Sequence, residues 1–191
     1  MLKQSTSRPA DAVVDHIVLH FCSDVIQHPD HPYDIDRITE IFSKAPASAN
    51  YLIARDGTVY RLVPEERSAW HAGAGHLPWA PMIKQMNGRS IGIEMFAVGS
   101  ANDMKLFGMK DYDAWVKKHP QWVGFSDQQY ATLAKLIAEI ESRHPAITHD
   151  RFHVIGHEEW AGRRRRTDPG ELFDWTKIGL TKERPTTQPS E

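Results

Sequence analysis

The chain has 191 residues, of which 40% are hydrophobic and 25% charged, with one cysteine and a formal net charge of -2. This length predicts one domain with its own core, the single cysteine excludes a disulfide framework, and the charge balance excludes a basic nucleic-acid interface. No apolar run reaches the roughly 18 residues that span a bilayer, and from the polar N-terminal residues we expect no secretory signal. We therefore expect a cytoplasmic protein.

The first half of the chain is predicted to contain a buried strand, a helix and a hairpin. Residues 12–21 (AVVDHIVLHF) form a short run rich in Val and Ile, which is typical of a buried strand and places His20 near its end. Apolar residues at helical spacing predict a short helix over 34–44. The pair Asp56-Gly57 lies between two β-prone runs and predicts a hairpin with a type I′ turn, which requires positive φ.

The second half is predicted to contain two strands and the longest helix. Residues 90–97 (SIGIEMFA) alternate, so Glu94 lies opposite the apolar face and is directed either into a cleft or into solvent. Residues 126–143 predict a helix, because a capping box precedes an apolar stripe at helical spacing. Residues 152–156 predict another short strand, which ends at His157.

This order of elements predicts an α/β fold, a single domain with a central mixed β-sheet and helices packed mainly on one face. The domain is expected over 11–180, between flexible polar tails at 1–10 and 181–191. Residues 98–125 are rich in aromatic side chains but have no clear regular pattern. We expect an irregular insertion there, which is either functional or a surface segment packed by its own side chains.

Two histidines at predicted strand ends and one aspartate are candidate metal ligands. His20 and His157 are the two among 11 histidines that end predicted strands, and Asp168 lies in the segment TDPG. Catalytic zinc takes three nitrogen, oxygen or sulfur ligands and keeps one position for water, so this set fits. Each residue also has a structural alternative, since a strand-end histidine is often a hydrogen-bonded core residue and an aspartate before Pro-Gly is an ordinary turn residue.

Four segments in a fixed order carry a resemblance to a known family. They are HIVLH, SANYLIARDGTVYRLVPEERSAWHAG, RSIGIEM and VIGHEEWAGRRRRTDPGELFDW. With this series the chain resembles the zinc-dependent N-acetylmuramoyl-L-alanine amidases of the amidase-2 and peptidoglycan-recognition-protein superfamily. Within it, the chain is most similar to cytosolic anhydromuramyl-peptide amidases and related phage lysins, so export by a holin or a secretion system is the alternative to a cytoplasmic location. The resemblance extends over residues 12–178.

The resemblance implies an amidase domain with a Zn²⁺ site on the open side of the sheet. His20, His157 and Asp168 match the three zinc ligands of the family, and Glu94 matches the acidic residue that activates the attacking water. The implied reaction is hydrolysis of the amide between the lactyl group of N-acetylmuramic acid and L-alanine. Peptidoglycan or a muropeptide is the implied substrate.

Three further positions are implied to contact substrate or stabilise the oxyanion. His71, in WHAG, matches a position that lines the substrate groove. Arg166 stands where relatives commonly have lysine; because arginine stays protonated, it is expected to stabilise negative charge without transferring a proton. Asn50 stands where relatives usually have histidine, and it is expected either to bind substrate or to be a polar residue at a strand start.

The main alternative is a non-catalytic peptidoglycan-binding module on the same fold. Such modules typically lack a zinc ligand, whereas all three positions are filled here. An unrelated metallohydrolase would require the whole motif series to be a coincidence. No nucleic-acid partner and no membrane span are expected, and the sequence leaves protein partners and oligomeric state open.

Overall fold

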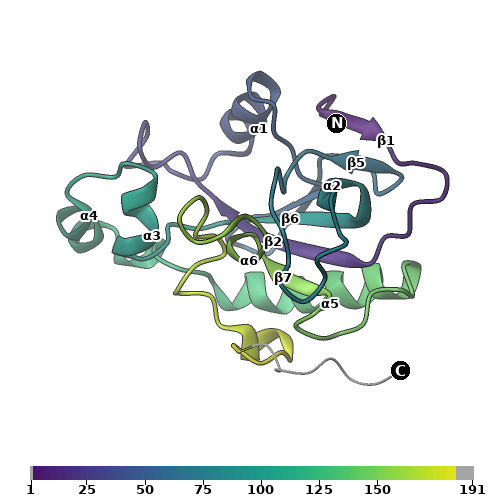
Figure 1. Cartoon of the computed structure of the whole chain (residues 1–191). Coiled ribbons are helices and arrows are strands. Elements are labelled where there is room, and N and C mark those ends of the chain that lie inside the picture. Colours follow the sequence, from purple (N-terminus) through teal and green to yellow (C-terminus); the bar gives the residue numbers. More distant parts are fainter. Residues whose placement is uncertain (1, 184–191) are drawn as a thin grey trace.

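The computed structural model describes residues 2–183 and contains a five-stranded mixed sheet at its centre (Figure 1). The strand order is β4-β3-β6-β2-β7; β3, β6, β2 and β7 are parallel, and β4 is antiparallel to β3. The predicted α/β domain with a mixed sheet is therefore confirmed. The strands are β2 (His16–Cys22), β3 (Tyr51–Ile53), β4 (Val59–Arg61), β6 (Ser90–Phe96) and β7 (Val154–Gly156).

One face of the sheet packs against α5 (Asp127–Arg143), the longest helix, which lies below the sheet in Figure 1. Leu19 of β2 and Ile93 of β6 form one buried apolar cluster with Leu133 and Ile137 of the helix. The helix begins at the predicted capping box, in which Ser126 and Gln129 exchange hydrogen bonds of 3.0 and 3.1 Å. The predicted helix is therefore confirmed, and its apolar stripe forms the main core.

Short helices flank the opposite face. Helix α1 (Ile35–Lys44) packs Ile38 against β3 and β6, and α6 (His157–Ala161) packs Trp160 against β2 and β7. Helix α2 (Met86–Arg89) immediately precedes β6. β2 and β7 are parallel neighbours, so their C-terminal ends lie side by side at one edge of the sheet. Side chains at these two ends can therefore approach one another.

The predicted hairpin is confirmed, but its turn differs from the expected type. Strands β3 and β4 pair antiparallel around Asp56-Gly57. Gly57 has φ +86°, whereas Asp56 does not have positive φ. The type I′ prediction is therefore wrong; a single left-handed glycine suffices, as in longer hairpin loops.

The N-terminal residues contain a strand where we expected only a flexible tail. β1 (Ser5–Ser7) pairs antiparallel with β5 (Arg67–Ala69), and the Arg8 side chain donates hydrogen bonds to four backbone carbonyls. Because this short polar strand has no apolar periodicity, neither the strand nor its pairing with β5 could be predicted from the sequence. Of the expected C-terminal tail, residues 184–191 lie outside the described residues.

The segment 98–125 forms helices that its sequence pattern did not predict. They are too short for a periodic stripe, and they pack Met104 and Trp115 against Phe21 and Val25.

Among the described residues, no helix combines the length and apolarity required to cross a bilayer. The remaining helices are α3 (Ala101–Leu106), α4 (Tyr112–Lys118), η1 (Pro120–Trp122) and η2 (Trp175–Ile178).

Candidate metal centre

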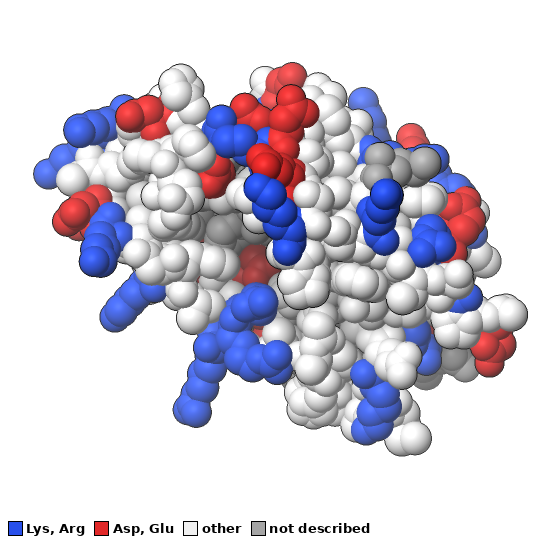
Figure 2. Space-filling model, turned by 90° about the horizontal axis from the view of Figure 1, so that it is seen from above, with Lys and Arg blue, Asp and Glu red and all other residues white. Residues whose placement is uncertain are grey.

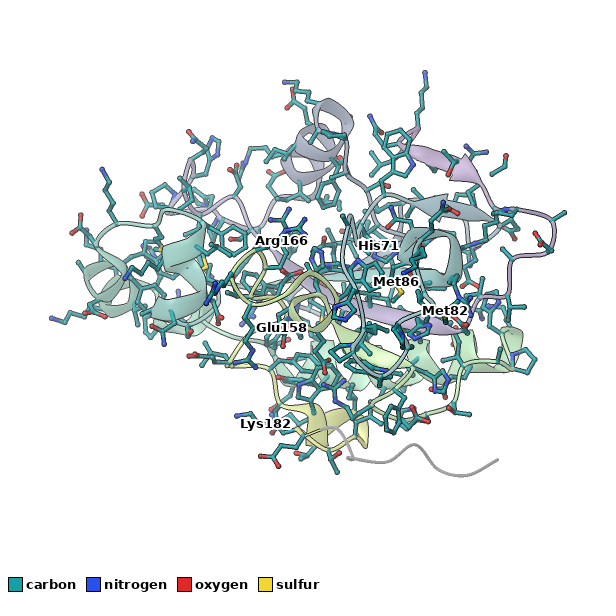
Figure 3. The ribbon with its side chains drawn as sticks, in the orientation of Figure 1. His71, Met82, Met86, Glu158, Arg166 and Lys182 are labelled. Carbon is teal, nitrogen blue, oxygen red and sulfur yellow. The ribbon has the colours of Figure 1, made fainter. Side chains whose placement is uncertain are left out.

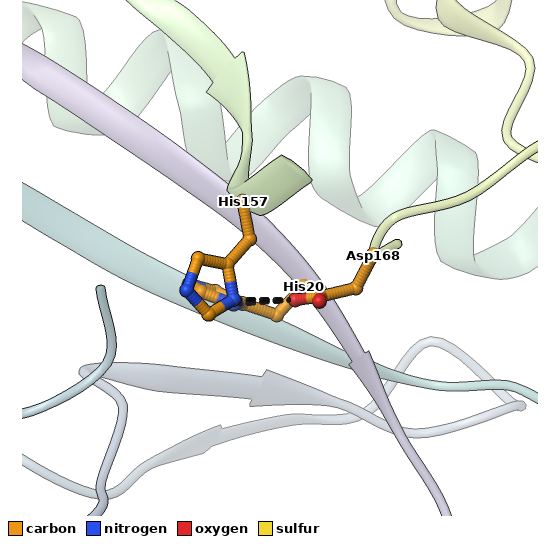
Figure 4. Close-up of side chains that lie close together, drawn as sticks. All are labelled: His20, His157 and Asp168. Carbon is orange, nitrogen blue, oxygen red and sulfur yellow. Dashed lines mark hydrogen bonds and ion pairs between the residues drawn. The ribbon is translucent and has the colours of Figure 1, made fainter. Parts of the chain in front are cut away.

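The three predicted metal ligands converge at one point on the open face of the sheet (Figure 4). His20 lies near the end of β2, His157 begins α6 directly after β7, and Asp168 lies in the loop that follows. The Nδ1 atoms of His20 and His157 are 3.1 Å apart. Asp168 Oδ2 lies 2.8 Å from the first and 2.9 Å from the second. All three residues are buried.

The protonation states of this group suit a divalent cation. Burial, together with the neighbouring His157, lowers the pKa of His20 to about 4, so its imidazole is neutral. Burial would raise the pKa of Asp168, but hydrogen bonds with His157 and His20 hold it below its usual range. His157 Nε2 donates to the backbone carbonyl of Ala72 at 3.0 Å, which leaves the Nδ1 lone pair directed at the group. Two imidazole nitrogens and a carboxylate oxygen are a donor set that zinc takes in catalytic sites.

A cavity of about 510 Å³ opens over these ligands. Figure 2 shows the hollowed face, with acidic atoms within the hollow and basic side chains near its rim. Phe107, which directly follows α3, contributes to the wall, so part of the unpredicted helical region borders the site. The other lining residues that matter for the chemistry are His20, His71, Glu94, His157, Arg166 and Asp168.

Glu94 is a buried carboxyl group placed beside the candidate ligands. It lies opposite His20 in the pairing of β6 with β2, and it lines the cavity. Burial and the negative charge of Asp168 raise the pKa of Glu94 to about 8, against the opposing effect of the Cys22 thiol. Its Oε2 atom is buried without a hydrogen-bond partner among residues 2–183. A carboxyl with these properties can accept and return a proton near neutral pH.

His71 and Arg166 both border the cavity, on the upper side of the sheet in Figure 3. The two ring nitrogens of His71 lie 3.1 Å from His20 Nε2 and 3.1 Å from Ser90 Oγ. Arg166 is exposed, and its Nη1 donates to the Arg165 carbonyl at 3.0 Å. The guanidinium therefore keeps donors available to an anion in the cavity.

Asn50 lies outside the site, in contrast to the expectation that it binds substrate. Its side chain is completely buried: Oδ1 accepts from the Gly92 amide at 3.0 Å, and Nδ2 lies 3.3 Å from the carbonyls of both Val63 and Pro64. Because these bonds use both ends of the amide, Asn50 supports the backbone of β6 and of the turn after β4. The alternative interpretation, a structural polar residue, is the one that the structure supports.

The fold and the site define a class of α/β proteins that carry a buried two-histidine, one-carboxylate group able to hold a metal ion, beside a second acid. Within this class, the chain belongs to the Amidase_2 family, whose model is described as N-acetylmuramoyl-L-alanine amidase and matches residues 7–171.

Curated relatives include two kinds of amidase. The 1,6-anhydro-N-acetylmuramyl-L-alanine amidase AmpD of Enterobacter cloacae is 31% identical over 131 residues, which cover 69% of this chain and 54% of the relative. The N-acetylmuramoyl-L-alanine amidase AmiD of Escherichia coli is 27% identical over 183 residues, which cover 91% of this chain and 56% of the relative. The chain thus spans about half the length of the curated relatives it matches.

Solved structures agree with this fold. A crystal structure of a selenomethionine AmpD derivative superposes with a TM-score of 0.69 at 26% identity, covering 93% of this chain and 89% of the other. The Escherichia coli AmiD complex with anhydro-N-acetylmuramic acid-L-Ala-D-gamma-Glu-L-Lys superposes with a TM-score of 0.63 at 24% identity, covering 90% and 59%.

Proposed function

We propose that this protein is a zinc-dependent amidase that hydrolyses the bond between the lactyl group of N-acetylmuramic acid and L-alanine. The observation that carries the proposal is the convergence of His20, His157 and Asp168 beside Glu94 in one cavity. Membership of the Amidase_2 family supports the same reaction. A module that only bound peptidoglycan would have no use for the buried acid next to a complete ligand set.

His20, His157 and Asp168 would hold the zinc ion. When bound, zinc supplies a Lewis acid that polarises a carbonyl and makes water more acidic. Glu94 takes the proton from the attacking water, because its carboxyl faces the cavity and its pKa is raised toward neutrality. The same carboxyl then returns that proton to the departing amine of L-alanine.

Arg166 stabilises the negative charge that develops on the carbonyl oxygen. It lines the cavity, and a guanidinium group offers a positive charge and several N–H donors to an oxyanion. Proton transfer is assigned to Glu94 alone. Glu94 is thus the general acid–base residue, and Arg166 is the residue that stabilises the oxyanion.

We propose a soluble anhydromuropeptide as the substrate and the cytoplasm as the place of action. The printed names of the AmpD relatives specify the 1,6-anhydro sugar, and the AmiD complex contains an anhydro-muramyl tripeptide. Intact sacculi are the competing substrate and would fit a lysin or an exported enzyme. Recycling of wall fragments is the role that matches the soluble substrate.

The test is to incubate the purified chain with anhydromuropeptides and, separately, with intact sacculi, and to resolve the products by mass. We expect about one zinc per chain, release of peptides that begin with L-alanine from the soluble substrate, and loss of this activity in dipicolinate. Restoration by added zinc is the control. Stoichiometric zinc without cleavage of either substrate would overturn the proposal in favour of a binding module.

A further inference from the structure

A chain of hydrogen bonds runs from His20 to the backbone carbonyl of Met86, the first residue of α2. His20 Nε2 lies 3.1 Å from His71 Nδ1, and His71 Nε2 lies 3.1 Å from Ser90 Oγ. Ser90 Oγ lies 2.6 Å from the carbonyl oxygen of Met86. Figure 3 labels His71 and Met86, which lie near one another because both contact Ser90.

The terminal carbonyl determines the direction of every bond in this chain. A carbonyl can only accept, so the Ser90 hydroxyl donates to Met86 and accepts from His71 Nε2–H. The other nitrogen of a neutral His71 then carries a lone pair, which accepts from His20 Nε2–H. The remaining nitrogen of His20, Nδ1, is left with its lone pair directed at His157 and Asp168.

The second candidate ligand, His157, is oriented by Ala72, the residue that follows His71 in the chain. The Ala72 carbonyl accepts from His157 Nε2–H at 3.0 Å, which leaves the Nδ1 lone pair of His157 free in the same way. Asn87 Oδ1 accepts from the backbone amides of His71 and Ala72 at 3.2 and 2.8 Å. One side chain of α2 therefore holds both residues that contact the ligand histidines.

The strand beneath this segment is shaped to admit the His71 ring. A Cβ atom added to Gly92 would lie 2.5 Å from His71 Cγ, closer than such contacts occur. Because both ring nitrogens are already bonded to His20 and Ser90, no ring nitrogen is left for a substrate.

We infer that the His71–Ala72 segment, held by Asn87, sets the tautomer and orientation of both metal-ligating histidines. His71 is thus a positioning residue that acts through His20, and the expected contact with substrate stays a prediction for this cavity-lining residue. The inference rests on the metal site of the proposed function. Partners of this kind raise metal affinity because they fix the ligand in its binding form before the ion arrives.

The first test compares zinc affinity in the whole chain, using a competing chelator, for His71→Phe, His71→Asn and the wild type. Phe keeps a ring but offers no acceptor to His20, so we expect zinc affinity to fall about 10–100-fold. Asn places an amide oxygen near the position of Nδ1 and is expected to recover most of the loss. The absorption bands of bound Co²⁺ should change in the Phe variant and return toward wild type in the Asn variant.

His16→Phe is the matched control. His16 is a buried histidine of the same strand as His20, but it pairs with Asp15 and not with the candidate ligands. Its replacement should leave zinc affinity and the Co²⁺ spectrum unchanged. Equal zinc affinity of His71→Phe and the wild type would overturn the inference while leaving the proposed function intact.

Asn87 provides a second test that leaves the His71 ring in place. Asn87→Ala removes the acceptor for both amides and should weaken zinc binding, whereas Asn87→Asp keeps an acceptor and should bind nearly as tightly as the wild type. Thermal unfolding of the metal-free variants checks that each is folded. An Asn87→Ala variant with unchanged zinc affinity and Co²⁺ spectrum counts against the inference. A wild-type chain that takes up neither zinc nor cobalt overturns the proposed function and this inference together.

Discussion

Strands β2 and β6 present apolar side chains to α5 on one face of the sheet and polar side chains to the cavity on the other. Leu19 and Ile93 pack into the main core, whereas their immediate neighbours His20 and Glu94 point to the candidate metal centre. Both sets are buried. Burial stabilises the apolar set, but it raises the pKa of Glu94 and lowers that of His20. The face toward α5 thus supports the fold, and the face toward the cavity carries the residues of the proposed reaction.

The largest expected effect on the cavity face comes from Glu94→Gln. Turnover should fall on the order of 10²–10⁴-fold, because the amide cannot accept the proton of the attacking water. Zinc content and thermal stability should stay near wild type, since Glu94 is not among the three converging ligands. Product release measured by mass, with zinc measured on the same sample, checks both. Wild-type turnover in this variant would show that another group is the base.

Arg166→Ala should lower kcat/KM on the order of 10²–10³-fold, the typical cost of losing one oxyanion donor. Arg166→Lys keeps the positive charge and should lose less. Steady-state kinetics on one anhydromuropeptide compares the three proteins. An Ala variant with full activity would remove Arg166 from the proposed mechanism.

On the opposite face, Ile137→Ala should lower the free energy of unfolding by about 2–5 kcal/mol, because it leaves a cavity between α5 and the sheet. The kcat of the folded fraction should be unchanged. Urea unfolding together with kinetics below the transition measures both quantities. If kcat fell while stability held, the separation between the two faces would be wrong.

The smallest effect concerns Glu65, which ties the turn after β4 to the end of α5. Burial would raise the pKa of Glu65, but hydrogen bonds with Arg143, Tyr51 and His144 lower it to about 2, from an ordinary value of 4.5. A lowered acid pKa stabilises the fold above the unfolded value and loses that contribution as pH falls toward the folded value.

Glu65→Gln should therefore cost about 1–3 kcal/mol at neutral pH. The difference from wild type should shrink as pH falls from about 5 to about 2. Denaturant unfolding at several pH values measures it, and activity at neutral pH should be unaffected. A difference that grew on acidification would contradict the assigned sign.

Local patterns in the sequence were sufficient for the elements that carry their own signals. The capping box and stripe predicted α5, the Asp56-Gly57 pair predicted the hairpin, and the run ending at His20 predicted β2. The metal group was predictable only through the motif series, because His20 and Asp168 are brought together by tertiary structure and not by local spacing.

The features that escaped prediction depend on partners far along the chain. β1 exists because β5 pairs with it, and the short α3 and α4 are held by packing on other segments. The sequence leaves Asn50 between binding substrate and a structural role, because a polar side chain looks the same in sequence whether it is exposed or bonded to backbone. Two acceptors in the hydrogen bonds that orient the histidines are the backbone carbonyls of Ala72 and Met86, and these leave no sequence signal because every residue has a carbonyl.

The candidate ligands His20 and Asp168 are 148 positions apart. An ion shared between them would tie the first strand of the central sheet to one of the last loops of the domain, as a removable cross-link. A nascent chain cannot complete the site until that loop has left the ribosome, so metal uptake follows synthesis of nearly the whole domain. Fragments that end before Asp168 would lack one of the three ligands, and with it the ion-mediated cross-link between the first strand of the central sheet and this loop.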